Sequence, residues 1–187
     1  HYDDVDSKFW HEAAVVGWRP DLERNESPKT LLDYMSNLKE TSQKNDEKFD
    51  YRTVLTNLVA LAAERACGEK FQTILQKYIW DKLHAECDAK IVTDKNGFPY
   101  MGAGMNASAR DLAKFGLMLM NNGVFNGTQV VPASWIQATL SQNEKYKNNF
   151  LKSEYALRLP DFHYRNQTWV GDKSTMLCLG IYGQAIL

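Results

Sequence analysis

Two short segments of this 187-residue chain carry residue types that could take part in catalysis, and the first surrounds Tyr51. Its phenol stands in the sequence Phe49-Asp50-Tyr51-Arg52-Thr53, which leads directly into a segment with helical spacing. An unperturbed tyrosine has a pKa of about 10, so it is a useful proton carrier near neutral pH only beside a cation or a helix N-terminus. A tyrosine that simply packs against the first turn of a helix would give the same sequence.

The second segment is the glycine-rich stretch Cys178-Leu179-Gly180-Ile181-Tyr182-Gly183-Gln184, which we expect to form a strand. A backbone N–H on such a strand can stabilise a developing oxyanion, and this needs no particular side chain. Cys178 and Leu179 themselves offer neither a positive charge nor a hydroxyl. Glycine-rich apolar strands are also common in buried sheets, so the segment by itself does not define a site.

A formal Ser-x-x-Lys match occurs at Ser36-Asn37-Leu38-Lys39. In some serine hydrolases the serine of such a motif is acylated and a desolvated lysine is its base. With nine serines and fifteen lysines in the chain, about 0.7 such pairs are expected by chance. Ser36 is also expected in the middle of a helix beside polar residues, and we therefore interpret the match as accidental.

Two other arrangements fit their chemistry less well. His84-x-x-Cys87 supplies two metal ligands without a second pair, which is insufficient for a structural zinc site. Cys178 with His163 as its base would make a thiol hydrolase, but nothing in the sequence brings the two together. We favour structural roles for these residues, and the sequence implies no metal and no organic cofactor.

The periodicity of apolar residues predicts the elements that must position these groups. Helices are expected near residues 28–38, 53–67 and 71–83, a short hairpin around Asn96-Gly97, and strands at 155–159, 168–170 and 176–187. The first 24 residues are interpreted as a loop with a short helix, and the residues after Ser141 as a polar linker. This order predicts an α+β fold.

The region from Gly102 to Trp135 contains the densest set of signals. Ser108 and Asp111 predict a reciprocal capping box at the start of a helix that Gly123 ends. Leu112, Phe115 and Leu119 recur on one face of this helix. After it we expect a turn at Asn126-Gly127, a short strand at Val130-Val131, and a helix from Pro132 that carries Trp135 and Ile136 inward.

This order of elements resembles the serine hydrolase family that contains class C β-lactamases, DD-peptidases, related esterases and the 6-aminohexanoate-dimer hydrolases. The Gly-Ile-x-Gly-Gln form at Gly180–Gln184 resembles the 6-aminohexanoate-dimer hydrolase and esterase branch. The resemblance implies a partial β-lactamase/transpeptidase-like α+β fold, in which a helical region precedes antiparallel strands. Residues 1–187 would form the middle and C-terminal part of one domain, without its N-terminal nucleophile region and its last strand or helix.

The resemblance also implies residue roles in a serine hydrolase that cleaves amide or ester bonds through an acyl-enzyme. Tyr51 would carry the proton from the nucleophile to the leaving group, and the N–H of Ile181 would bind the oxyanion. The residues implied to contact the substrate are Asn106, Tyr2, Thr53, Gly180 and Tyr182. The nucleophilic serine would lie upstream of His1, so the chain alone is expected to be inactive.

Cys178 occupies the position where β-lactamases and DD-peptidases carry a cation for the substrate carboxylate. A buried anion needs such a partner, so short linear amides and carboxylic esters rank above β-lactams. Penicillin-binding or β-lactamase activity is one alternative. A non-catalytic β-lactamase-like domain for binding or interaction is another.

Composition limits the class of partner. The net charge is −1 and no Lys/Arg run occurs, which disfavours nucleic acid. The chain contains no membrane segment, and the expected partners are a small-molecule or short-peptide-like substrate and the missing N-terminal part of the same domain. Three cysteines without close paired spacing leave both the cytoplasm and the periplasm open.

Overall fold

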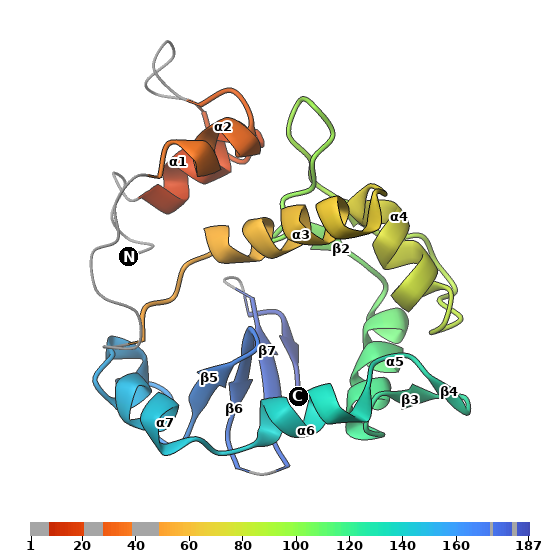
Figure 1. Cartoon of the computed structure of the whole chain (residues 1–187), viewed down its shortest axis with the longest axis vertical. Helices are drawn as coiled ribbons and strands as arrows, with labels where there is room; N and C mark the ends of the chain where they lie inside the picture. The colour runs from red at the N-terminus through yellow and green to blue at the C-terminus, as the bar shows by residue number, and fades with distance from the viewer. Residues whose placement is uncertain (1–7, 21–27, 39–48, 173, 181–182) are drawn as a thin grey trace. The chain divides into compact units, whose positions relative to one another are not determined.

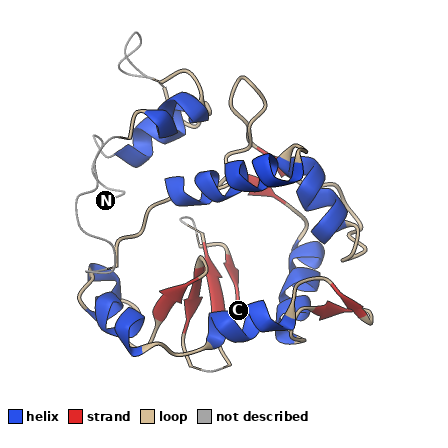
Figure 2. Ribbon diagram, viewed as in Figure 1, coloured by secondary structure: helices blue, strands red, loops and turns tan. Residues whose placement is uncertain are grey.

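The computed structural model describes residues 8–20, 28–38, 49–172, 174–180 and 183–187 (Figure 1). It combines helices with antiparallel strands, which confirms the α+β class (Figure 2). Contacts divide the chain into two compact units. The first consists of residues 1–40, 52–77 and 89–106, and the second of residues 41–51, 78–88 and 107–187. No helix in the described ranges is both long enough and apolar enough to cross a bilayer.

The first unit is mainly helical. Its elements are α1 (Lys8–Val15), α2 (Leu31–Ser36), α3 (Val54–Cys67), α4 (Phe71–Leu75), β1 (Lys90–Ile91) and β2 (Met105–Asn106). The predicted end of α3 is confirmed, because Gly68 takes the left-handed conformation (φ 66°) and its N–H donates to the carbonyl of Glu64 at 2.8 Å. The two short strands pair antiparallel.

The core of the first unit contains both apolar and polar side chains. The buried apolar residues are Ala13, Leu31, Tyr34, Met35, Ala60 and Tyr100. Among the buried polar residues, Asp94 accepts hydrogen bonds from the N–H groups of Leu31 (2.9 Å) and Phe98 (3.0 Å). The carboxylate thus ties the predicted turn at Asn96-Gly97 to the start of α2, and a bridge between Thr93 and Pro99 confirms the short hairpin.

Helix α2 is shorter than the prediction of residues 28–38. It begins after Thr30, whose Oγ1 accepts from the N–H of Asp33 at 3.0 Å. Ser36 is its last residue and is exposed, so the expectation of a mid-helix position was wrong. An exposed serine at a helix C-terminus supports the interpretation of Ser36–Lys39 as an accidental match.

The predicted helix over residues 71–83 is also interrupted. After Leu75 the chain widens into a π-helical turn, η1 (Gln76–Trp80). Such a turn shifts the phase of the apolar stripe, so the residues that reach the core are Trp80 and Leu83, whereas Tyr78 is exposed.

The second unit contains a four-stranded sheet and four helices or helical turns in its described part after residue 107. The elements are α5 (Ala109–Met120), β3 (Val124–Phe125), β4 (Thr128–Gln129), α6 (Ala133–Leu140), α7 (Glu144–Leu151), η2 (Glu154–Leu157), β5 (His163–Arg165), β6 (Thr168–Val170), β7 (Met176–Leu179) and β8 (Ala185–Ile186). Strands β5 to β8 are antiparallel neighbours in sequence order (Figure 1). The predicted strand at residues 168–170 is confirmed, and the predicted strand at 176–187 is two strands.

A hydrophobic cluster anchors α5 in the second unit. It is built on the buried residues Leu83, Met118 and Val130, with Phe115 and Leu119 packed against them. The predicted inward face of the helix is therefore confirmed. Gly123 follows α5 at φ 82°, and its N–H donates to the carbonyl of Met118 at 2.9 Å.

In the hairpin after α5, the second strand lies two residues before the predicted strand at Val130-Val131. Asn126 and Gly127 form the expected turn with φ values of 46° and 76°, but they join β3 to β4. Val130-Val131 is not a strand, because both of its N–H groups donate to the carbonyl of Gly123 (2.8 and 3.2 Å).

The polar stretch after Ser141 was wrongly interpreted as a linker. It forms α7, whose N-cap Asn143 accepts from the N–H groups of Lys145 and Tyr146. The strand expected at residues 155–159 is instead the 3-10 turn η2. In α6, Ile136 is buried as expected, whereas Trp135 is 39% exposed.

Candidate active site

Tyr51 lies at the edge of an aromatic cluster in the second unit. The other rings of this cluster are Phe49, Phe150, Tyr155, Tyr164 and Trp169. The Tyr51 ring is stacked on the indole of Trp169, with 5.9 Å between centroids and 8° between planes. Edge contacts from Tyr164 (5.5 Å) and a tilted contact from Tyr155 (5.9 Å) hold it further. The ring therefore has a defined orientation although Tyr51 precedes α3 and lies outside any helix or strand.

The neighbouring backbone also fixes the segment that carries Tyr51. The N–H of Phe49 donates to the carbonyl of Asn149 in α7 at 3.4 Å. The Phe49 ring packs on buried Phe150 at 5.3 Å. Aromatic contacts of this kind contribute beyond the area that they bury, so the segment is attached at more than one point.

The aromatic cluster connects Tyr51 to the strand that carries the second candidate segment. Trp169 in β6 pairs with Leu177 in β7, and β7 leads to Gly180. The N–H of Gly180 donates to the carbonyl of Gln184 at 2.8 Å, and the N–H of Gly183 donates back to Gly180 at 3.2 Å. The chain thus reverses between β7 and β8. A Cβ at position 180 would meet the side chain of Gln184, which packs over this glycine.

Three of the predicted site residues lie outside the described residues. They are Tyr2, Ile181 and Tyr182. The oxyanion role of Ile181 and the substrate contacts of the other two remain predictions.

Cys178 lies on β7 opposite Ile186, and its thiol is half-buried. Burial raises the pKa of this thiol above its usual value. A neutral thiol at neutral pH is a poor nucleophile and carries no charge, which argues against the thiol-hydrolase alternative. It also cannot attract a substrate carboxylate.

Thr53 and Asn106 belong to the first unit. Thr53 directly precedes α3, and its side chain faces Gly102 so closely that a Cβ at this glycine would overlap the Thr53 methyl. Asn106 ends β2, is exposed, and donates from Nδ2 to the carbonyl of Gly104 at 3.4 Å. Asn106 is thus the last residue of a short strand that follows the turn at Gly102–Gly104. Its contact with substrate remains a prediction.

The chain is similar to known hydrolases over almost its whole length. No protein-family model matches it. A curated relative, the 6-aminohexanoate-dimer hydrolase of Paenarthrobacter ureafaciens, is 28% identical over 185 residues, which is 98% of this chain and 46% of the relative. A solved Bacillus anthracis structure named "putative 6-aminohexanoate-dimer hydrolase" superposes with a TM-score of 0.82 at 26% identity, over 95% of this chain and 44% of the other.

The chain is similar to β-lactamase-related hydrolases in sequence and in fold. A structure from Bacteroides dorei DSM 17855 named "putative beta-lactamase" has the same fold, with a TM-score of 0.58 at 20% identity over 87% of this chain and 49% of the other. The chain spans about half the length of the curated relative that it matches. These findings confirm the fold class and agree with the resemblance that the sequence indicated.

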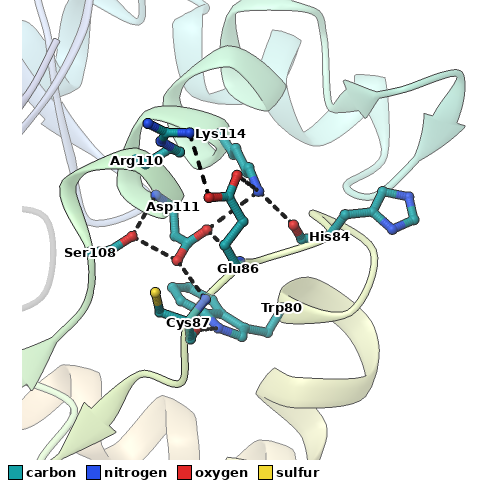
Figure 3. A network of polar contacts seen from close by, with 8 residues as sticks. All are labelled: Trp80, His84, Glu86, Cys87, Ser108, Arg110, Asp111 and Lys114. Carbon is teal, nitrogen blue, oxygen red and sulfur yellow. Dashed lines mark hydrogen bonds and ion pairs between the residues drawn. The ribbon is translucent and has the colours of Figure 1, made fainter.

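The predicted capping box at α5 is only half correct. The Oγ of Ser108 accepts from the N–H of Asp111 at 3.1 Å, as expected. The Asp111 carboxylate, 1% exposed, instead accepts from the N–H groups of Glu86 (2.8 Å) and Cys87 (3.2 Å) and from the Ser108 hydroxyl (2.7 Å) (Figure 3). The N–H of Glu86, and next the Ser108 hydroxyl, lower the pKa of Asp111 below its usual value.

Lys114 completes the network at the start of α5. Its Nζ lies 3.1 Å from a Glu86 carboxylate oxygen and 3.5 Å from Asp111, and it donates to the carbonyl of His84 at 2.5 Å (Figure 3). The loop of residues 84–88 is therefore attached to the first turn of α5. His84 and Cys87 serve this attachment through their backbone groups.

The sequence did not predict the aromatic residues that contact Tyr51. Tyr164 stands between His163 and Arg165 on β5, and Trp169 stands in the short segment Thr168–Val170 on β6, whose three residues are all buried. The strand β6 was predicted, but the contact between Trp169 and Tyr51, which is distant in the sequence, was not. Only the fold brings the two rings together.

Proposed function

We propose that the complete protein is a serine hydrolase that cleaves amide or ester bonds through an acyl-enzyme. In this proposal the nucleophilic serine comes from a part of the protein outside residues 1–187, Tyr51 carries protons, and the N–H of Ile181 binds the oxyanion. The similarity to a 6-aminohexanoate-dimer hydrolase over 98% of the chain, together with the backbone match at a TM-score of 0.82, is the observation that carries it.

The proposed chemistry has two stages. The serine Oγ attacks the carbonyl carbon while its proton passes to the ionised Tyr51 oxygen, and the oxyanion accepts a hydrogen bond from the backbone N–H of Ile181. Collapse of this intermediate expels the amine or alcohol, which takes a proton from the Tyr51 hydroxyl. Water then attacks the acyl-enzyme by the same route and releases the carboxylic acid.

The stacked position of Tyr51 supports this role. Proton transfer needs an oxygen held at a fixed place, and the contact with Trp169 fixes the plane of the ring. The phenol also needs a cationic neighbour to work near neutral pH. A lysine three residues after the nucleophilic serine would supply this charge.

Cys178 supports the proposed substrate class. A half-buried thiol with a raised pKa offers no charge for the carboxylate of a β-lactam or of a peptide C-terminus. We therefore place short linear amides whose carboxylate lies far from the scissile bond, and simple carboxylic esters, ahead of β-lactams.

Steady-state kinetics of the full-length protein test the proposal. We expect hydrolysis of a linear ω-amino-acid dimer or of a p-nitrophenyl ester, with nitrocefin turned over at least about a hundredfold more slowly. Tyr51→Phe should lower kcat by about 10²–10⁴-fold with little change in KM, because it removes the proton carrier and keeps the stacked ring. Tyr146→Phe, which alters an exposed tyrosine of α7, is the matched control and should keep full activity. Faster turnover of nitrocefin than of the ester would overturn the substrate assignment.

A further inference from the structure

A buried polar contact in the first unit joins α1, α3 and the turn of residues 101–104. Asn57 lies in the first turn of α3 and is fully buried. Its Nδ2 donates to Oε1 of Glu12 in α1 at 2.5 Å. Its Oδ1 accepts from the N–H groups of Met101 (2.8 Å) and Gly102 (3.2 Å). Glu12 is itself only 1% exposed, so the whole contact is shielded from water.

The chemistry of the partners fixes the orientation of the Asn57 amide. Backbone N–H groups can only donate, so Met101 and Gly102 require the carbonyl oxygen of the amide. An ionised carboxylate can only accept, so Glu12 requires its NH2 group. Rotating the amide by half a turn would oppose donors to donors and acceptors to acceptors in a buried place, which is strongly unfavourable.

The same turn is held from its other side by close packing. A Cβ at Gly102 would overlap the methyl group of Thr53, so backbone and side chain are in direct contact there. Gly104 takes φ +83°, and a Cβ at this position would meet the side chains of Val92 and Trp18. The turn then leads into β2, which ends at Asn106. The conformation of this turn therefore determines the position of Asn106.

We propose that Glu12 and Asn57 are positioning residues that hold the 101–104 turn and, through it, set the place of Asn106. This inference rests on the proposed function, in which Asn106 contacts the substrate. Neither Glu12 nor Asn57 touches the substrate in this account.

The environment of Glu12 makes this contact sensitive to pH. Burial raises the pKa of Glu12 to about 7, and the hydrogen bond from Asn57 opposes part of this rise. The charge of Glu12 is also felt by Tyr34, whose pKa is raised chiefly by burial, and Arg52 acts on Tyr34 in the opposite direction. Because Asn57 favours ionised Glu12, the amide should be held more firmly above pH 7 than below it.

Asn57→Asp in the full-length protein is the sharpest test, because it keeps the shape and the acceptor oxygens and removes only the donor. At pH 8.5 two carboxylates would face each other, and we expect the backbone amides of residues 101–102 to exchange with deuterium about 10–100 times faster. At pH 6 one shared proton can replace the missing donor, so protection should return. KM for the substrate should follow the same pattern while kcat stays unchanged.

The polarity swap provides the rescue. When Glu12→Gln is combined with Asn57→Asp, the amide introduced in α1 can donate to the carboxylate introduced in α3, and that carboxylate still accepts from Met101 and Gly102. We expect this double variant to recover protection and KM at pH 8.5. Glu12→Gln alone keeps an acceptor for Nδ2 and removes the titrating charge, so its protection should not change between pH 6 and 8.5. Asp33→Asn, an exposed acid of the same unit, is the matched control.

Two results would overturn the inference. One is deuterium exchange at residues 101–102 in Asn57→Asp that equals the wild type at pH 8.5. The other is deuterium exchange at residues 101–102 whose dependence on pH is the same in the wild type and in Glu12→Gln. This second comparison remains decisive if Asn57→Asp does not fold. Exchange needs no substrate, so absence of hydrolysis would count against the proposed function and not against this contact.

Discussion

The ring of Tyr51 lies parallel to the indole of Trp169, with centroids 5.9 Å apart and 8° between the planes. Trp169 is 7% exposed and sits on β6, whose neighbour β7 leads to Gly180. A tyrosine outside any regular element thus takes its orientation from the sheet. The sheet carries both the support of Tyr51 and the strand next to the proposed oxyanion donor.

Trp169→Phe should therefore affect catalysis as well as stability. The smaller ring leaves a gap beneath Tyr51, and we expect a loss of about 1–3 kcal/mol in the free energy of unfolding. In the full-length protein kcat should fall by about tenfold, because a shifted phenol no longer meets the leaving group. Urea unfolding and steady-state kinetics measure the two effects.

Phe150→Leu is the control for this change. Phe150 is buried and touches Trp169, but its ring makes no contact with the Tyr51 ring among the aromatic contacts of the described residues. It should lose stability but lose less kcat than Trp169→Phe, because Phe150 holds Tyr51 only through Phe49. Equal losses of kcat in both variants would mean that the cluster acts only through general stability.

Gly123→Ala should be clearly more harmful than Gly127→Ala. Both glycines have positive φ, of 82° and 76°. A Cβ at Gly123 would overlap the carbonyl of Val131, whereas nothing lies within 4 Å of one at Gly127. We expect Gly127→Ala to cost about 1 kcal/mol from backbone strain, and Gly123→Ala to cost at least about 2–3 kcal/mol from strain and overlap. Equal unfolding midpoints in urea would contradict this.

Asp111→Asn should loosen the loop of residues 84–88. The new NH2 group would face the N–H groups of Glu86 or Cys87, so donors would oppose donors. Because the pKa of Asp111 is lowered in the folded state, its contribution is present above about pH 4 and is lost as pH falls through the lowered value. The Tm at pH 7 should decrease, and the variant should lose part of the acid sensitivity of the wild type.

Arg110→Gln is the comparison for Asp111→Asn. Arg110 and Glu86 approach to 3.7 Å, but both side chains are largely exposed. An exposed pair of this kind contributes little, and the Tm of Arg110→Gln should match the wild type. A larger decrease for Arg110→Gln than for Asp111→Asn would show that the charge pair, and not the buried carboxylate, holds the loop.

His163 should make the second unit less stable in mild acid. It is 1% exposed, and its Nε2 has no hydrogen-bond partner within the described part of the chain. Burial lowers the pKa of His163 below 6.5, the charges of Arg165 and Lys147 act in the same direction, and a backbone hydrogen bond with Val170 opposes them. The unfolded chain therefore binds the proton first, and stability is lost as pH falls below about 6.5.

His163→Phe should remove this slope. The free energy of unfolding, measured by urea titration from pH 5 to pH 7.5, should fall toward acid in the wild type and stay flatter in the variant. Parallel curves for the two proteins would show that another group is responsible.

Local signals in the sequence predicted those elements whose reasons are local. Gly68 and Gly123 end helices because the chain needs positive φ there, and Ser108 caps α5 with its own hydroxyl. The strand at residues 168–170 follows from its short apolar run between turns. These features depend on neighbours a few residues away, and the sequence contains them in full.

The predictions were wrong or incomplete where a residue distant in the sequence determines the local structure. Asp111 has the correct type and spacing for a capping box, but the N–H groups of residues 86–87 compete for its carboxylate. Helix α7 has too little apolar content to be recognised, and it depends on Asn143 and on the burial of Phe150. The contact between Asn57 and Glu12 had no sequence signal, because each looks like an ordinary polar residue of an amphipathic helix.

Labelling of the full-length protein with a fluorophosphonate, followed by peptide mass mapping, tests the central claim most directly. The account predicts one adduct, on a serine outside residues 1–187 that is followed three residues later by lysine, with prior incubation in an ester substrate slowing its formation. An adduct on Ser36, or no serine adduct in a correctly folded full-length protein, would contradict it.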